Sequence, residues 1–305
     1  MSITRANPLW NVTIPPKGTV KLPETPDSAR LRDPQVGFSV RVSEIKKGRS
    51  EPVPRFFIDP SAVSGDTVTL TGENAHHASY SLRLAPGDRI KVCDQQTAYL
   101  CEMVSFDGET ATARILSADP IDTEPPFAAR LYQALPKGDK LDTVIQKAVE
   151  CGVREVIPFE SSRCIVRAKP EAEGRKTERR CRIAEEAAKQ CGRGVIPTVR
   201  PTVTFSDALK AAEGADLVLF CYEGAAVTPL PAIIERASPA LDAARAEGRT
   251  PEIAIFVGSE GGFSPEEAEA ASARGFAMTG LGKRILRTET ASGFVLSCLI
   301  YALEL

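Results

Sequence analysis

The strongest chemical signal in the chain is a glycine-rich turn that follows an apolar strand. The expected strand Glu252–Val257 runs into Gly258-Ser259-Glu260-Gly261-Gly262. Glycines let the backbone approach a ligand closely and adopt positive φ angles. In an open α/β sheet, ligands bind beyond the carboxyl ends of the strands. The turn therefore predicts a ligand site here, although glycine is also the commonest residue of ordinary turns.

The residues after this turn predict where the next helix begins. Ser264 is followed by Pro265 and, three residues after the serine, by Glu267. This is the pattern of a capping box with proline at the first helical position. The cap fixes the helix start directly after the glycine turn.

A second cluster combines a glycine with three cations ahead of the last expected helix. After a short strand, Phe276–Thr279, the chain reads LGKRILRTETA over residues 281–291. A helix N-terminus beside Arg and Lys is a ready anion site. Thr288 or Thr290 is the expected N-cap, and plain capping of the last helix would produce the same pattern.

From Ala129 onward the expected strands and helices alternate, which predicts a parallel sheet covered by helices. The expected strands are Arg130–Ala134, Val153–Phe159, Val195–Val199, Asp216–Cys221, Glu252–Val257 and Phe276–Thr279. The expected helices are Leu141–Val149, Arg175–Gln190, Ser206–Ala212 and Ala232–Ala246. Neither G-x-G-x-x-G after the first strand nor G-x-x-x-x-G-K-[ST] occurs, so a Rossmann dinucleotide site and a P-loop both lack their fingerprints.

The part before this alternation predicts a small β-barrel of short strands separated by turns. Its expected strands are Phe56–Asp59, Asp66–Leu70, Asp88–Cys93, Ala98–Phe106 and Thr110–Leu116, with one short helix near Ala75–Leu84. Residues 1–54 contain eight prolines and little periodicity, and we expect a loosely ordered extension there. The predicted domains are thus residues 55–120 and 130–305, joined by a linker at 121–129.

Charge and composition limit the partners of the chain. A net charge of −2 over 305 residues argues mildly against nucleic-acid binding, which usually leaves a basic footprint. Between Arg163 and Arg193, however, ten Lys or Arg stand against five acidic residues. A local basic patch can bind phosphate on an acidic protein, and a solvated helix face would show the same charges.

The cysteines and histidines do not form a metal-site pattern. The eight cysteines contain no C-x-x-C pair, and the histidines are the adjacent His76 and His77. Zinc sites need clustered Cys and His at short spacings, so we expect reduced, mostly structural thiols and no metal.

No apolar run approaches the length needed to span a bilayer. We expect a cytoplasmic enzyme with no membrane partner.

The two glycine loops, taken together with motifs upstream, carry a family resemblance. They resemble the cofactor-binding loops of the RsmE family, which belongs to the SPOUT superfamily and methylates N3 of a uridine in 16S ribosomal RNA. Further strings that look like this family, in order, are RFF at 55–57, HH at 76–77, LRLAPGD at 82–88, LPKGDK at 135–140, IQKAVECGV at 145–153, SRC at 162–164 and QCGRG at 190–194. The resemblance covers roughly residues 55–305.

The resemblance implies a fold, a cofactor and partners. The fold would be a PUA-like barrel that helps to hold RNA, followed by a trefoil-knotted α/β methyltransferase domain with a parallel sheet. Knots are rare exceptions to ordinary topology, so the pattern of elements alone could not predict one. The cofactor would be S-adenosylmethionine, the substrate 16S ribosomal RNA during small-subunit maturation, and the enzyme a homodimer that needs no metal.

The resemblance and the loops together nominate site residues. For the cofactor we predict Gly258, Glu260, Gly261, Leu281, Gly282, Ile285 and Leu286, with Leu219 and Phe220 completing the wall. Arg287 and Glu289 are the predicted catalytic residues, because a guanidinium can stabilise the negative charge that develops as uracil loses its N3 proton. Arg55, Arg163 and Arg193 are the predicted RNA contacts.

Three departures from the family and two rival functions remain open. Ser259 stands where proline is usual, and Lys189 stands where glutamate is common. The stretch Ala78-Ser-Tyr-Ser replaces a Leu- and Arg-rich segment, which puts the RNA contact of that helix in doubt. The rival functions are a SPOUT enzyme that acts on transfer RNA or a ribose hydroxyl, and a non-catalytic RNA-binding paralogue.

Overall fold

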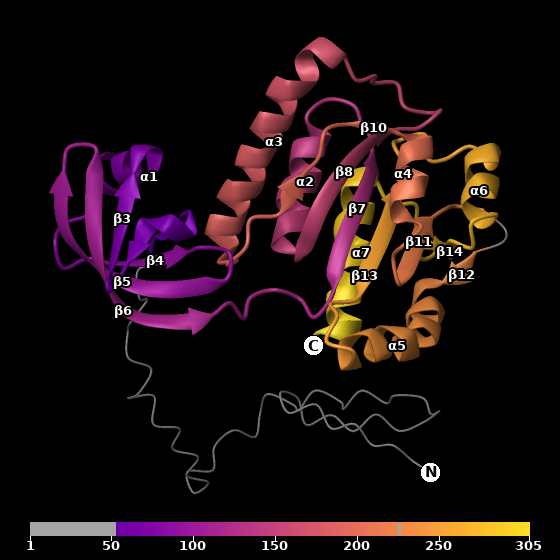
Figure 1. Ribbon diagram of the computed structural model, residues 1–305. Coiled ribbons are helices and arrows are strands. Elements are labelled where there is room, and N and C mark those ends of the chain that lie inside the picture. Colours follow the sequence, from indigo (N-terminus) through magenta and orange to yellow (C-terminus); the bar gives the residue numbers. More distant parts are fainter. Residues whose placement is uncertain (1–52, 225–226) are drawn as a thin grey trace, which may run out of the picture. The chain divides into compact units, whose positions relative to one another are not determined.

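The computed structural model describes residues 53–224 and 227–305 of the chain. These residues form two separate sheets, one before Ile121 and one after Phe127 (Figure 1). The expectation of an extension at 1–54 falls almost wholly outside the described residues. The predicted domain limits therefore remain predictions, although the change from one sheet to the other lies within the predicted linker.

The first sheet is a six-stranded half-barrel with the strand order β1-β4-β5-β6-β3-β2. Strands β1 and β4 pair in parallel, and the other neighbours pair antiparallel. Phe56, Leu70, Ile90 and Met103 fill its core and are at most 1% exposed. Its elements are β1 (Arg55–Phe57), η2 (Pro60–Ala62), β2 (Val63–Ser64), β3 (Thr67–Thr71), α1 (Gly72–His76), η3 (His77–Ser81), β4 (Arg89–Cys93), β5 (Thr97–Asp107) and β6 (Thr110–Pro120).

The short helix of this domain differs from the one that the sequence predicts. It begins at Gly72 rather than near Ala75, and after His76 it widens into a π-helical turn. The N–H of Leu82 donates to the carbonyl of His77, five residues back, at 2.9 Å. Single π-helical turns are uncommon and concentrate at functional sites.

The second sheet is entirely parallel, as the alternating pattern predicts, with the order β10-β8-β7-β13-β11-β14-β12 and β9 paired to β8. Its strands are β7 (Ala128–Ala134), β8 (Val153–Glu160), β9 (Thr198–Val199), β10 (Val203–Thr204), β11 (Leu217–Cys221), β12 (Thr228–Pro229), β13 (Glu252–Val257) and β14 (Ala277–Gly280). The expected strand Val195–Val199 shrinks to Thr198–Val199, and ahead of it Gly194 N–H donates to Thr123 Oγ1 of the linker. The trefoil threading remains a prediction from the resemblance.

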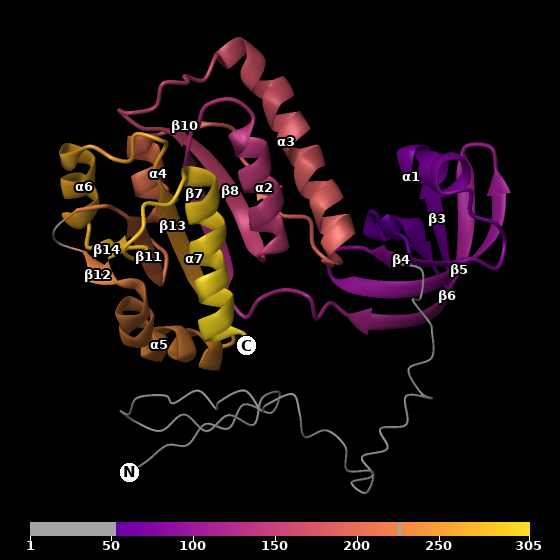
Figure 2. The ribbon, with the colours of Figure 1, turned by 180° about the vertical axis from the view of Figure 1, so that it is seen from behind.

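Helices cover both faces of this sheet. Opposite views show α2 and α7 over one face of β7, β8 and β13, and α4 over the other (Figures 1 and 2). The helices are α2 (Lys140–Glu150), α3 (Pro170–Cys191), α4 (Phe205–Ala212), α5 (Leu230–Ala246), α6 (Pro265–Ser272) and α7 (Thr288–Leu303). Under α4 an aromatic cluster packs tightly, with Phe220 and Phe263 ring centroids 4.2 Å apart and Phe220 and Phe256 centroids 5.7 Å apart.

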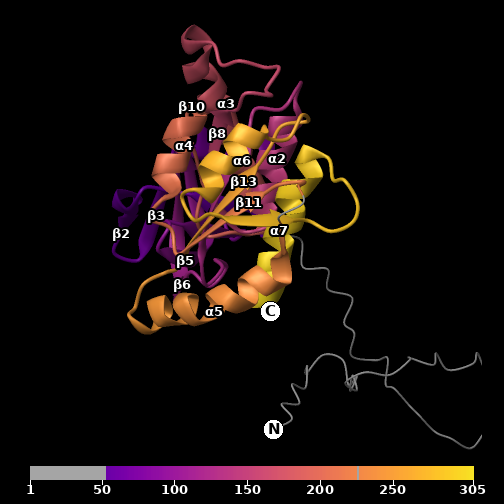
Figure 3. The same cartoon turned by 90° about the vertical axis from the view of Figure 1, so that its right-hand side faces the viewer.

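The carboxyl ends of the parallel strands meet at one edge of the sheet. Figure 3 shows α5 across the end of the sheet opposite to α6, which follows β13. The predicted capping box is confirmed: Ser264 Oγ accepts from Glu267 N–H, and the Glu267 carboxylate accepts from Ser264 N–H. Helix α7 starts at Thr288, but its N-cap is Arg287 rather than either predicted threonine.

Candidate functional site

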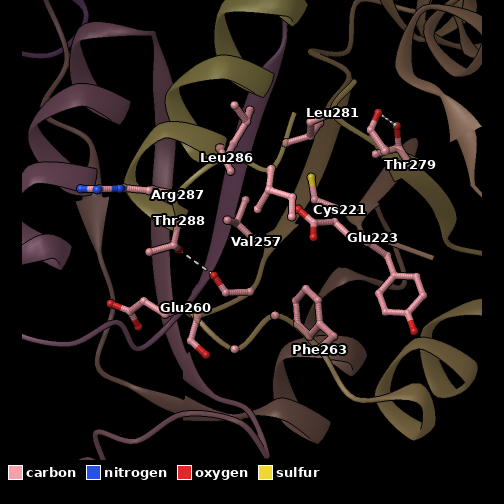
Figure 4. Close-up of a pocket in the computed structure, with 18 of the residues that line it drawn as sticks. Cys221, Glu223, Val257, Glu260, Phe263, Thr279, Leu281, Leu286, Arg287 and Thr288 are labelled. Carbon is pink, nitrogen blue, oxygen red and sulfur yellow. Dashed lines mark hydrogen bonds between the residues drawn. The ribbon is translucent and has the colours of Figure 1, made fainter. Parts of the chain in front are cut away.

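A hollow of about 1050 Å³ lies at the carboxyl edge of the parallel sheet. Three loops form most of its wall: residues 221–224 after β11, residues 258–263 after β13, and residues 281–287 after β14. In Figure 4, Glu260, Thr288 and Arg287 lie on one side, and Cys221, Glu223 and Thr279 lie on the opposite side. The hollow thus has two polar sides with apolar side chains between them.

The 258–263 loop is held in one conformation by its own backbone. Ser259 and Gly262 form an antiparallel bridge, and Gly262 has a positive φ of 64°. A Cβ on Gly258 would stand 2.9 Å from Gly262 Cα, which is closer than real side chains approach. Glycine at 258 is therefore a requirement of the loop itself, in addition to any contact with a ligand.

A buried network ties this loop to the start of α7. Thr288 Oγ1 donates to the carbonyl of Gly258 at 2.6 Å and accepts from Gln133 Nε2 at 2.8 Å. Gln133 is fully buried at the end of β7, and Thr288 is 5% exposed. Hydrogen bonds between buried groups are strong in a medium of low dielectric constant and hold their members in place. The network therefore joins three elements that are distant in sequence at the floor of the hollow.

Lys140, at the start of α2, connects two carboxylates of the site. Its Nζ lies 2.9 Å from Glu260 Oε1 and 3.5 Å from Glu289 Oε2. Burial raises the pKa of Glu260, but the hydrogen bonds from Lys140 and from Lys137 N–H outweigh it and hold that pKa below its usual value. The Glu260 hydrogen bond in turn raises the pKa of Lys140. Lys140 and Glu260 thus stabilise each other's charged form.

The 281–287 loop is open by comparison. Gly282 has a φ of 102°, a backbone conformation that favours glycine, and Ile285 is 84% exposed. Within the described residues, no side chain from Lys283 to Arg287 makes a hydrogen bond or ion pair. In Figure 4 the Arg287 guanidinium extends away from Leu281 and Leu286. Its five N–H donors remain available to a ligand.

The structure brings most of the predicted cofactor residues together around the hollow. Those that line it are Gly258, Glu260, Gly261, Leu281, Gly282, Ile285 and Leu286. Leu219 and Phe220 do not line it: both are fully buried inside β11, where Phe220 belongs to the aromatic cluster. The packing of Arg163 explains why glycine stands at position 261, since a Cβ there would lie 3.1 Å from Arg163 Cβ. A larger residue at 261 would therefore displace Arg163 whether or not it touched a ligand.

Several lining residues were missed by sequence reasoning, namely Lys140, Cys221, Tyr222, Glu223, Gly224 and Thr279. The rule that ligands bind beyond strand ends points to the residues after β11, not to the last residues inside it. Burial raises the pKa of the Cys221 thiol to about 12, so this wall residue is neutral. Glu223 is exposed and offers a carboxylate to the hollow.

The predicted RNA contacts are placed very differently from one another. Arg163 is exposed beside the hollow, and its Nη1 donates to the Gly261 carbonyl at 3.0 Å. Arg55 is half-buried, and its Nη1 donates to the carbonyl of Arg193. Arg193 itself is 4% exposed, and its guanidinium bonds Glu124 and the carbonyls of Val149 and Val153. This placement gives Arg193 a structural role and removes it from the RNA-facing surface.

The basic stretch is also less available than its composition suggests. Arg179 pairs with Asp142, Lys189 with Glu185, and Arg180 with Glu173 in the interior. The exposed cations of the stretch that make no ion pair with another described residue include Lys169, Arg175 and Arg182.

The described residues, 53–224 and 227–305, show neither a metal-binding cluster nor a membrane-spanning helix. In that part of the chain, no group of three or more His, Cys, Asp or Glu side chains is arranged to hold a metal ion. No helix there combines the length and apolar character needed to cross a bilayer. All eight cysteines are free of disulfides.

Comparison with known proteins places this arrangement in a family. Residues 123–300 match the profile of an RNA methyltransferase domain, and residues 70–116 match that of an RNA methyltransferase PUA domain. The ribosomal RNA small subunit methyltransferase E of Bacillus subtilis is 30% identical over 259 residues, covering 82% of this chain and 97% of the relative. The chain belongs to the ribosomal RNA small subunit methyltransferase E family.

Solved structures of related proteins agree with this assignment. The Neisseria gonorrhoeae enzyme of that name, bound to S-adenosylmethionine, matches with a TM-score of 0.68 at 30% identity, covering 82% of this chain and 97% of that one. A Legionella pneumophila protein, also in complex with S-adenosylmethionine, matches with a TM-score of 0.68 at 28% identity over 82% of this chain and 98% of that one. The family and the mixed α/β fold predicted from the sequence are confirmed.

Proposed function

We propose that the protein transfers a methyl group from S-adenosylmethionine to N3 of a uridine in 16S ribosomal RNA, in the cytoplasm and during small-subunit maturation. The observation that carries the proposal is the hollow between the two glycine loops at the carboxyl edge of the sheet. The structural relatives that hold S-adenosylmethionine support this choice of cofactor. The choice of uridine N3 rests on the family resemblance of the two loops.

The residues of the hollow fit S-adenosylmethionine in size and chemistry. A volume of about 1050 Å³ is at the upper end of what a ligand of this size requires. Val257, Phe263, Leu281 and Leu286 supply apolar surface for a purine. Glu223 supplies a carboxylate for hydroxyl or cationic groups. When bound, S-adenosylmethionine supplies an activated methyl group on a sulfonium.

The acceptor side of the site lies at the start of α7. Arg287 carries a guanidinium without a partner in the described residues, next to a helix N-terminus that favours negative charge. A uracil ring that loses its N3 proton becomes anionic, and an oriented guanidinium would stabilise that charge. The neighbouring Glu289, whose Oε2 lies 3.5 Å from Lys140 Nζ, is the proposed group that accepts a proton or a hydrogen bond from the substrate.

The RNA and subunit contacts are also proposals. Arg163, which lies beside the hollow, and Arg55 are the proposed RNA contacts, and the match to an RNA methyltransferase PUA domain supports an RNA substrate. We further propose a homodimer. Phe294 and Tyr301 of α7 are 39% and 78% exposed, which leaves large aromatic groups for a second copy to cover.

The proposal is tested by titrating the protein with S-adenosylmethionine and then mapping methylated nucleotides. We expect calorimetric binding, and transfer of labelled methyl to small subunits from a strain that lacks this activity, with mass spectrometry placing the label on uridine N3. Leu281→Glu, which puts a charge in the hollow, should abolish binding, whereas Leu116→Glu on the exposed barrel surface should not. Label on transfer RNA or on a ribose would favour a different SPOUT activity, and RNA binding without cofactor binding would favour a non-catalytic paralogue.

A further inference from the structure

An exposed aromatic pair stands on the half-barrel, outside the hollow. The rings of His76 and Tyr80 stack with centroids 4.7 Å apart and planes 24° apart. Tyr80 is 66% exposed, and His76 is exposed as well. Stacking with His76 uses one face of the Tyr80 ring, so the high exposure leaves the other face open to solvent. The phenylalanines and the other tyrosine of this domain are buried or partly buried, so Tyr80 stands out as an exposed ring.

The turn that carries the pair is anchored firmly beneath it. Ala75 and Ala78 are buried in the barrel core, and the other histidine, His77, packs edge-on against Phe56 at 6.0 Å. Ser79 Oγ donates to the carbonyl of Ala75 at 2.7 Å, and the π-helical hydrogen bond closes the turn. The turn that carries the two rings is thus held in place by buried residues and by its own hydrogen bonds.

The chemistry of the turn favours a planar ligand over a phosphate. No Lys or Arg occurs from His77 to Leu82, so this surface offers no charge to a sugar–phosphate backbone. The first cation is Arg83, which has a φ of 53° although it is not glycine. Residues held in this region are sparse and concentrate at functional sites. Arg83 lies beyond the π-helical turn, so the turn itself offers an aromatic face on which a base can stack.

We propose that His76 and Tyr80 form a stacking platform for an unpaired base of the RNA substrate. The match to an RNA methyltransferase PUA domain spans both residues. Proteins recognise RNA mainly by stacking unpaired bases on aromatic side chains. Tyr80 lies in the stretch Ala78–Ser81, where this chain departs from the Leu- and Arg-rich segment of the family that it resembles. The inference rests on the proposed action on RNA.

The experiment measures the affinity of the full chain for a short single-stranded RNA that carries a fluorescent adenine analogue, and for the same RNA annealed into a duplex. Tyr80→Leu keeps apolar area but removes the π face, and it should weaken single-strand binding by about 5- to 100-fold. Tyr80→Phe should bind within about 2-fold of the wild type, because it keeps the ring. Leu82→Ala, on the same turn and 38% exposed, is the matched control and should bind normally.

In Tyr80→Leu the KM for RNA should rise. The variant should keep its affinity for the duplex, its affinity for the cofactor and its turnover number at saturating RNA. Equal single-strand affinity of Tyr80→Leu and the wild type would overturn the inference, as would equal losses in Tyr80→Leu and Leu82→Ala. An equal loss for the duplex would overturn it too, because a duplex offers no unpaired base. If the wild type binds RNA through this turn but transfers no methyl group, the platform stands and the proposed catalytic function fails.

Discussion

The two glycine loops that bound the hollow differ in how they are held. The 258–263 loop has a backbone bridge between Ser259 and Gly262, and Ser264 caps the helix that follows it. Gly258, Glu260 and Gly261 form hydrogen bonds to other elements. The 281–287 loop is exposed from Gly282 to Ile285 and is fixed at its end by Thr288. Segments with few buried contacts are the ones that open and close at low free-energy cost. The first loop therefore supplies a preformed wall, and the second is the part that can adjust around a bound ligand.

The largest expected effect comes from Arg287, in the open loop. Arg287→Lys keeps a charge but loses the planar, bidentate donors. If the guanidinium stabilises the deprotonated uracil, turnover should fall by about 10²-fold or more while cofactor affinity changes only a few-fold. Single-turnover rates at saturating S-adenosylmethionine measure this. Recovery of the rate at saturation would assign Arg287 to loop shape instead, and would make Glu289 the next residue to test.

Thr288, which joins the two loops, should contribute to the free energy of unfolding. Thr288→Val removes the donor to the Gly258 carbonyl and the acceptor for Gln133, and leaves buried polar groups with fewer partners. We expect a loss of about 1–3 kcal/mol in the free energy of unfolding, measured with denaturant. Thr290→Val, on an exposed position of the same helix turn, should stay within about 0.5 kcal/mol. Equal losses of unfolding free energy in the two variants would show that the buried hydrogen bonds of Thr288 do not stabilise the fold.

Alanine substitutions at Gly258 and Gly282 test directly whether the two loops differ in rigidity. Gly258→Ala places a Cβ against the backbone of Gly262, so both stability and cofactor affinity should fall. Gly282→Ala meets no atom within 4 Å, and only its positive φ is strained. It should cost about 1–2 kcal/mol in the free energy of unfolding, through backbone strain alone, and weaken S-adenosylmethionine binding several-fold. Calorimetry and thermal melts of both variants check this, and the reverse ranking of their stabilities would contradict the comparison.

The smallest expected effect is on pH dependence. The pKa of Glu260 is depressed in the folded protein, so its ion pair stabilises above the unfolded pKa and is lost as the pH falls through the folded pKa. Lys140→Met should move that pKa upward toward its unfolded value, so the stability that this carboxylate contributes at neutral pH, and loses on acidification, should become smaller. A carboxyl titration by NMR measures the shift. Lys147→Met, which removes another exposed ion pair of α2, is the control and should leave Glu260 unchanged.

The parts of this molecule that sequence could predict are those governed by local rules. The capping box at Ser264, the strand Glu252–Val257 and the parallel sheet all follow from periodicity and end signals. The π-helical turn after His76 was missed, because no residue preference marks it. Arg193 was misplaced because one sequence does not say whether an arginine bonds phosphate or buried carbonyls. Gln133, Lys140 and Glu223 were missed because long-range pairing alone brings them to the hollow.

The Gln133–Thr288 hydrogen bond has a consequence for the timing of folding. It joins residues 155 positions apart, and β7 pairs with β13 across a comparable stretch of chain. Contacts so distant in sequence form slowly, because the intervening segment must be ordered first. On a ribosome, the half-barrel can fold while the remainder is still being synthesised. The hollow cannot close until residue 288 has emerged, so a nascent chain of this enzyme would gain its cofactor site only after the start of α7 has been synthesised.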